Sequence, residues 1–238
     1  MKGSSIRLVL VIVGLAAAVA LGAQSTEREL TVEELYLRDI EFQILSEKAF
    51  SDSREIKLDV LDEIEAMIEG GTVDDPDKVE FVLEYLGMEG TARRVRESAR
   101  LVNYYPEVRR RSANLLGRLG GERAKNALVS ILLIDDEPMV KAEAAYALGV
   151  VGMNDGNEVI RALLYTLENE DPQMPDNNLA YAVCLAVEKI VEATDGDLDS
   201  AAYADLARTL VRIAQGNYIK TVRRKALQTL EVLKEYQS

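Results

Sequence analysis

The sequence predicts an all-α protein, an α-solenoid of antiparallel helix pairs with about eleven helices. The first observation behind this prediction is a helix-pair pattern that is written twice, beginning at Pro106 and again at Pro138. Gly117 in the first copy matches Gly149 in the second, so the pattern repeats after 32 residues. A repeat of that length indicates stacked helical hairpins, each of which buries its apolar face only against a neighbour. The second observation is that no stretch of the sequence shows strand-like alternation of apolar and polar residues.

The N-terminal part of the chain is predicted to be helical. Thr31 and Glu34 form a capping box, in which each side chain accepts a hydrogen bond from the other residue's backbone N–H. Gly70-Gly71 ends a second helix, and Pro76 begins a third, because proline is tolerated in the first helical turn. The helices predicted here span about 31–50, 54–70 and 76–87.

A fourth helix is expected over about 91–105, as the second half of a degenerate repeat that begins near residue 76. Its apolar residues recur at helical spacing and are Ala92, Val95, Ala99 and Val102. Arg93, Arg96 and Arg100 fall at i, i+3 and i+7, on the opposite face of the same predicted helix.

The two clear repeats follow from simple packing rules. From Val140 to Val151, apolar residues recur at i, i+4, i+7, i+8 and i+11, which is one stripe of a helix. Small residues such as Ala144 suit a helix that packs closely against neighbours on both sides. Gly149 and Gly152 end the helix and supply the backbone freedom that a tight turn needs. Three further helices are predicted over about 177–193, 201–215 and 218–235.

The motif Pro-x-Val-Arg/Lys…Ala-x-x-Leu-Gly-x-x-Gly in both copies resembles the HEAT repeat, in its short bacterial HEAT-like (PBS-lyase) form. The match is good over residues 106–170 and extends less clearly over about 76–236. The resemblance implies a scaffold for protein–protein interaction, since HEAT-like repeats mark scaffolds far more often than catalysts. The fold alone does not fix a function.

The composition excludes several kinds of chemistry. The chain has no histidine, which removes the commonest general base and the commonest metal ligand. Its single cysteine, Cys184, excludes an intramolecular disulfide and lies in an apolar stripe, as a buried small hydrophobe would. We therefore expect no catalytic, cofactor-binding or metal-ligating residue and no cofactor. An enzyme of the phycobilin-lyase kind, which the repeat resembles, and a self-assembling or membrane-tethered structural component are the alternatives.

Residues 1–23 are predicted to be a signal peptide. Lys2 and Arg7 give a positive start, an apolar run follows from Leu8 to Leu21, and small residues close the segment. The run is short for a membrane span, which needs about 20 apolar residues. We expect cleavage and a periplasmic or otherwise exported protein, with an uncleaved N-terminal membrane anchor as the alternative. The predicted remainder is an N-terminal helical cap at 24–75 and a HEAT-like repeat solenoid at 76–238.

Three alternating carboxylates at Asp195, Asp197 and Asp199 resemble the opening of a calcium-binding loop. Ser200 stands where such a loop needs glycine, and Leu206 stands where it needs the bidentate glutamate. The other interpretation is a solvated turn in which Asp199 or Ser200 caps the next helix. The sequence leaves both open.

A basic block interrupts an acidic protein. The chain has a formal net charge of −13, whereas residues 91–125 hold ten basic and three acidic side chains, a net charge of +7. Residues 24–90 have a net charge of −14 and residues 126–238 have −8. Part of the block is expected to be structural, because Arg109, like Lys141 and Arg223, occupies a position that pairs with acidic residues of adjoining repeats.

The remaining arginines are the candidate partner-binding residues. They form two predicted rows, one on the helix expected over 91–105 and one on the next helix, which stacking would merge into one positive patch. The candidates are Arg93, Arg96, Arg100, Arg110 and Arg118, with Asn114 in the second row. We expect the partner to be another protein with an acidic surface, or a second copy of the chain. Nucleic acid is not expected, because the total charge repels phosphate, and a membrane is expected only if the N-terminal segment stays uncleaved.

Overall fold

The computed structural model describes residues 31–236 and divides the chain into two units, Met1–Glu41 and Phe42–Ser238. The predicted signal peptide lies outside the described residues. In the first unit, α2 (Val32–Ala49) begins and continues into the second. The backbone N–H of Thr31 donates to Glu34 Oε2 at 2.7 Å, and the N–H of Glu34 donates to Thr31 Oγ1 at 3.2 Å. The predicted capping box is confirmed, and the hydrogen bond from Thr31 lowers the pKa of Glu34.

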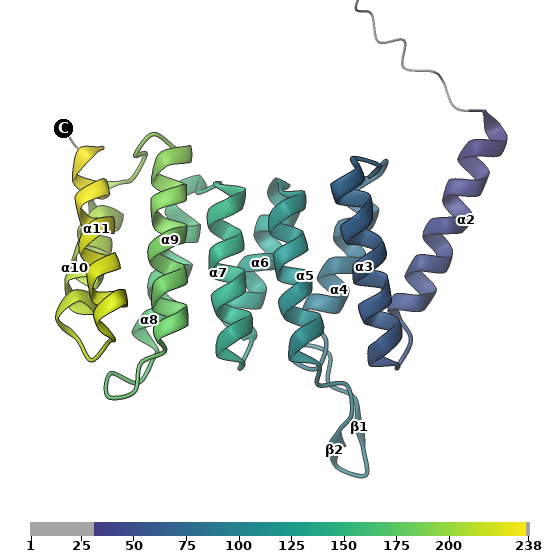
Figure 1. The fold of residues 1–238 in the computed structure, drawn as a ribbon, viewed down its shortest axis with the longest axis horizontal. Helices are drawn as coiled ribbons and strands as arrows, with labels where there is room; N and C mark the ends of the chain where they lie inside the picture. Colours follow the sequence, from purple (N-terminus) through teal and green to yellow (C-terminus); the bar gives the residue numbers. More distant parts are fainter. Residues whose placement is uncertain (1–30, 237–238) are drawn as a thin grey trace, which may run out of the picture. The chain divides into compact units, whose positions relative to one another are not determined.

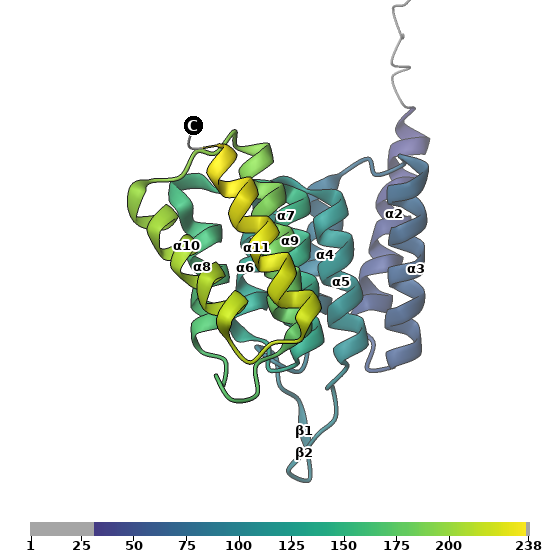
Figure 2. The same ribbon diagram turned by 60° about the vertical axis from the view of Figure 1, so that its left-hand side comes forward.

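The second unit is an α-solenoid of helices in two layers (Figures 1 and 2). Its front layer in Figure 1 contains α3 (Arg54–Gly70), α5 (Pro106–Leu119), α7 (Pro138–Val151), α9 (Asn177–Ala193) and α11 (Lys220–Glu235). The layer behind contains α4 (Pro76–Gly87), α6 (Gly121–Ile134), α8 (Glu158–Glu168) and α10 (Ser200–Gln215). The predicted fold class, an all-α solenoid of antiparallel helix pairs, is confirmed.

The helix ends follow the sequence signals. Proline occupies the first turn of α4, α5 and α7. Gly71 and Gly152 close α3 and α7 in the left-handed backbone region, with φ of 62° and 72°. The core lies between the two layers, where side chains such as Leu116, Leu128 and Leu148 are fully buried.

The prediction of a helix over residues 91–105 is wrong. This segment contains a short antiparallel hairpin, β1 (Arg96–Glu97) and β2 (Arg100–Leu101), which turns at Ser98 and Ala99 with φ of 48° and 68°. Asn103 holds the two arms together, since its Nδ2 donates to Arg93 O at 2.7 Å and its Oδ1 accepts from Val95 N at 2.9 Å. These side-chain bonds to the backbone compete with helix formation. Residues 31–236 therefore contain ten α-helices rather than about eleven.

Glycine sets the spacing of the central helices. A Cβ atom at Gly117 would lie 2.7 Å from Ala147 Cβ, and one at Gly149 would lie 2.5 Å from Ala186 Cα. Both distances are shorter than any packed side chain allows, so α5 with α7 and α7 with α9 approach closely only because these positions lack side chains. The expected burial of Cys184 is also confirmed, and burial raises the pKa of its thiol to about 12.

Within residues 31–236, no helix has both the length and the apolar character of a membrane span.

Candidate partner-binding surface

The β-hairpin is an insertion between two helix pairs. Residues 88–105 join α4 to α5, whereas the other links between pairs are residues 135–137, 169–176 and 216–219. Figure 1 shows the hairpin projecting past the start of α5, away from the helix layers. In repeat proteins, insertions gather in loops on one face, which is often the face that binds a partner. The hairpin is therefore the first candidate for a binding element.

Contacts fix the base of the hairpin to the solenoid. The Arg93 guanidinium lies 4.4 Å from the ring centroid of Tyr85 on α4. Tyr104, on the return arm, donates its hydroxyl to Asp136 at 3.1 Å, and its ring lies 4.6 Å from the guanidinium of Arg109. Burial raises the pKa of both tyrosines. The base is thus anchored, while the residues from Arg94 to Arg100 are all exposed.

The hairpin arginines do not pair with carboxylates of the described chain. Arg94 Nε donates to Thr91 O at 2.9 Å and Arg96 Nη1 donates to Ala99 O at 3.4 Å, both within the insertion itself. Across residues 31–236, neither Arg96 nor Arg100 has an ion-pair partner, and both side chains are exposed. Even with Glu97 opposite Arg100, the hairpin therefore carries a net positive charge on a protein whose formal net charge is −13.

In the second predicted row, on α5, two residues bind side chains of neighbouring helices and one does not. Arg118 binds Glu65 at 2.7 Å and Glu69 at 3.1 Å, both on α3. Asn114 donates to Glu143 on α7 at 2.9 Å. Arg110 is exposed and, in the part of the chain that the structure describes, has no ion-pair partner.

The structure thus separates the five candidate arginines. Arg96 and Arg100 lie together on the hairpin, and Arg93 packs at its base. Arg110 remains available on the first turns of α5, while Arg118 is engaged with α3. The expectation of one helical row formed by Arg93, Arg96 and Arg100 is wrong, because these residues do not lie on a helix.

Other basic residues of the block are structural. Arg109 is fully buried, with its Nε 2.6 Å from Asp135 Oδ2 and its Nη2 donating to Oδ1 at 3.0 Å. Burial is the largest influence and disfavours its charged form, but the hydrogen bond and charge of Asp135 together with Tyr104 outweigh burial and raise the pKa of Arg109. Lys141 pairs likewise with Glu170 at 3.4 Å, as expected. Arg223, the third expected member, is exposed and has no carboxylate partner among the described residues.

Asp199 is a helix cap. It accepts from Ala202 N at 2.7 Å at the start of α10, and also from Asn157 Nδ2 and Arg161 Nη2, each at 3.0 Å. The bond from Ala202 lowers the pKa of Asp199. The capping interpretation is confirmed. In the described range, His, Cys, Asp and Glu side chains form no group of three or more that is arranged to hold a metal ion.

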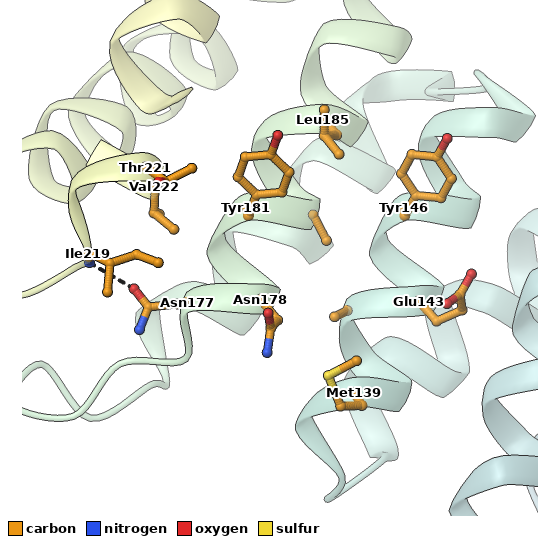
Figure 3. A pocket seen from close by; sticks show the side chains of 12 residues that line it. Met139, Glu143, Tyr146, Asn177, Asn178, Tyr181, Leu185, Ile219, Thr221 and Val222 are labelled. Carbon is orange, nitrogen blue, oxygen red and sulfur yellow. Dashed lines mark hydrogen bonds between the residues drawn. The ribbon is translucent and has the colours of Figure 1, made fainter. Parts of the chain in front are cut away.

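Sequence reasoning missed an apolar pocket of about 350 Å³ in the front layer, between α7, α9 and α11. Figure 3 shows Tyr146 and Tyr181 standing side by side on neighbouring helices, with Met139 and Ile219 at the edges. The two tyrosines occupy matching positions in Ala145-Tyr146-Ala147 and Ala180-Tyr181-Ala182. This repeated Ala-Tyr-Ala pattern is the feature of the sequence that indicates the pocket, because matching positions on adjacent repeats point to the same face.

Comparison with known proteins supports the repeat assignment. A family model described as HEAT repeats matches residues 98–184, from the hairpin turn into α9. No curated protein matches the chain.

Proposed function

We propose that this chain, a HEAT-repeat protein over residues 98–184, is a non-enzymatic scaffold that binds an acidic partner protein through the hairpin between α4 and α5. HEAT repeats form helical scaffolds that are commonly used for protein interaction. The single observation that carries the proposal is the exposed pair Arg96 and Arg100, which forms no ion pair with a carboxylate within residues 31–236.

Folding stability does not account for these arginines. Exposed charges contribute little to stability, and ordering a projecting turn costs conformational entropy. An acidic partner accounts for them, because complementary charge speeds encounter and fixes the register of docking. Since the protein is otherwise acidic, such a partner is repelled over most of the surface and attracted at the hairpin. The hairpin therefore selects the orientation as well as the partner. The same net charge disfavours nucleic acid.

We further propose that the partner is met outside the cytoplasm, in the bacterial cell envelope. The support is the charged start, the apolar run and the small-residue end of residues 1–23. N-terminal sequencing of protein from its native source tests this, with a mature chain starting near Gln24 expected. A chain that still starts at Met1 would contradict cleavage and favour an uncleaved N-terminal membrane anchor.

Affinity capture from envelope extract tests the binding proposal. The bait is compared with the double variant Arg96→Glu/Arg100→Glu, which leaves Arg93 on Tyr85. The control is Arg208→Glu/Arg224→Glu, which changes the net charge equally at two exposed residues of α10 and α11. We expect the hairpin variant to lose the captured protein and the control to keep it, with both melting temperatures unchanged.

The alternative partner of the same chemistry is a second copy of the chain. Sedimentation of the purified protein separates the two cases, because self-association appears without extract and is lost in the hairpin variant. Equal capture by the hairpin variant and the wild type would contradict the proposed function.

A further inference from the structure

The pocket between α7, α9 and α11 has an apolar floor and a polar rim. Ala142, Ala182 and Val222 line it from the helices, and the tyrosine rings stand over it as walls (Figure 3). Among the described residues, neither Tyr146 nor Tyr181 has a hydrogen-bond partner for its hydroxyl, so both donors are available to an occupant. This arrangement suits an apolar side chain flanked by backbone carbonyl groups.

The pocket is open rather than enclosed. Ile219 is 57% exposed and Met139 is 42% exposed, so large apolar side chains at its edges lie in water. Sites for small molecules usually enclose most of their ligand, whereas a shallow site that crosses three helices suits a chain segment.

A charged path connects the pocket to the hairpin side of the protein. Glu143 lines the apolar pocket and also lines a polar pocket of about 190 Å³, whose other charged side chains are Glu65, Arg110 and Arg111. Arg111 is bound to Glu65 at 3.0 Å, so this pair neutralises itself. Asn114 donates to Glu143 at 2.9 Å, which engages the carboxylate at the junction. Arg110 lies beyond it, exposed and without a carboxylate among the residues that the structure describes. An occupant that extends from the apolar pocket past Glu143 therefore next reaches Arg110, the arginine of the polar pocket that forms no ion pair with a described carboxylate.

We propose that the pocket and Arg110 together bind an extended segment of the partner protein, in which an apolar side chain is followed or preceded by acidic residues. This inference rests on the proposed function and names the part of the partner that is recognised. Neighbouring helices lie about 10 Å apart, so the path from α11 to α5 is about 30 Å long. An extended chain covers about 3.3 Å per residue, which gives a segment of about nine residues.

Synthetic peptides test the inference on the purified full chain. Two labelled peptides carry two leucines at one end and a run of glutamates at the other, in opposite orders, and two controls carry only the leucines or only the glutamates. We expect fluorescence anisotropy to show binding of one mixed peptide. Met139→Glu and Arg110→Glu should each weaken it at least tenfold.

Met174→Glu is the matched control, because Met174 is 83% exposed and lies outside the pocket. It should leave affinity unchanged, and all three variants should keep the wild-type melting temperature. Equal affinity of Met139→Glu and the wild type would overturn the inference. Failure of both mixed peptides to bind at millimolar concentration would overturn it as well.

The partner capture described above keeps the two proposals distinguishable. If Met139→Glu still captures the partner while Arg96→Glu/Arg100→Glu does not, the proposal for the pocket is wrong and the proposal for the hairpin stands. If the hairpin variant captures the partner as well as the wild type does while Met139→Glu does not, the proposed function is wrong and the pocket is the binding site.

Discussion

The front layer of the solenoid joins its helices in two different ways. Between α5, α7 and α9, backbones approach so closely that Gly117 and Gly149 have no room for a side chain. Between α3 and α5, ion pairs bridge the helices, with Arg111 bound to Asp62 at 2.6 Å and to Glu65 at 3.0 Å. Arg118 adds two further pairs from the same helix to α3.

One position in the repeat explains the difference. Lys57, Arg109 and Lys141 are equivalent, because each pairs with a carboxylate in the link that follows its helix pair, Lys57 with Glu89 at 2.8 Å. Eight residues further along each helix stand Glu65, Gly117 and Gly149. Where this position is glycine, the next helix packs against the backbone. Where it is glutamate, the next helix is held by arginines instead.

The comparison also places the candidate binding element. The hairpin insertion enters at the link between α4 and α5, which is where the ion-paired junction meets the close-packed repeats. The arginines of α5 that face α3 form ion pairs across this junction, whereas the hairpin arginines form none with the described residues. Charge in the basic block therefore has two separate uses, one in joining repeats and one on the surface.

The largest expected effect comes from breaking the buried pair of Arg109, one of the pairs at the position that Lys57, Arg109 and Lys141 share. Arg109→Ala leaves Asp135 buried without its partner, so we expect a loss of about 3–5 kcal/mol in the free energy of unfolding. Urea denaturation measures it. Arg111→Ala, which removes pairs that are partly exposed, should cost about 1 kcal/mol or less. Equal costs for the two variants would contradict the distinction between this buried pair and the exposed pairs that join α3 to α5.

The next effect tests the close approach itself. Gly149→Leu forces a side chain into the space occupied by Ala186, and overpacking of this kind typically costs about 1–3 kcal/mol or more. Gly70→Ala is the control, since its added Cβ meets only ordinary contacts at Thr72. Its effect should stay within about 1 kcal/mol. Hydrogen exchange should show lost protection centred on α7 and α9 for the leucine variant, because repeats contact mainly their neighbours.

A smaller effect should appear with salt. At 1 M salt the screening length is about 3 Å, so the exposed pairs between α3 and α5 weaken while the apolar contacts do not. We expect hydrogen exchange of α3 and α4 to speed up by a few-fold, with α7 and α9 unchanged. Uniform change across all helices would show that the two junctions respond alike.

The smallest effect concerns Glu80 on α4. Burial raises the pKa of this carboxyl, although Arg123 opposes the shift. A carboxyl whose folded pKa is raised favours folding at pH below its ordinary value of 4.5 and loses that contribution as pH rises through the folded pKa. Glu80→Gln should therefore slightly raise stability at pH 7 relative to pH 4. A larger loss of stability at pH 7 than at pH 4 would mean that the pair with Arg123 dominates.

The repeat architecture could be predicted because it depends on local signals. Pro106, Pro138 and the glycines at the helix ends each act within one turn, so the bounds of α5 and α7 follow from the sequence. The hairpin could not be predicted in the same way. Ala92, Val95, Ala99 and Val102 have helical spacing, but Asn103 binds backbone groups eight and ten residues earlier and excludes the helix.

The candidate site was predictable only in part. The excess of arginine over residues 91–125 is visible in the sequence. Which arginines remain available depends on partners far along the chain, such as Glu65 for Arg118. The apolar pocket depends on three helices from three repeats, and no single segment shows it.

Site-specific crosslinking from the hairpin tests the central claim most directly. Val95→p-benzoylphenylalanine places a photoreactive group at an exposed apolar position on the hairpin arm, and Val211→p-benzoylphenylalanine on α10 is the matched control. After irradiation in envelope extract, we expect position 95 to form an adduct with an acidic protein and position 211 to form none. The adduct should disappear at high salt and with Arg96→Glu/Arg100→Glu. An adduct that persists in the charge-reversed variant, or equal adducts from both positions, would contradict the claim that the hairpin arginines bind the partner.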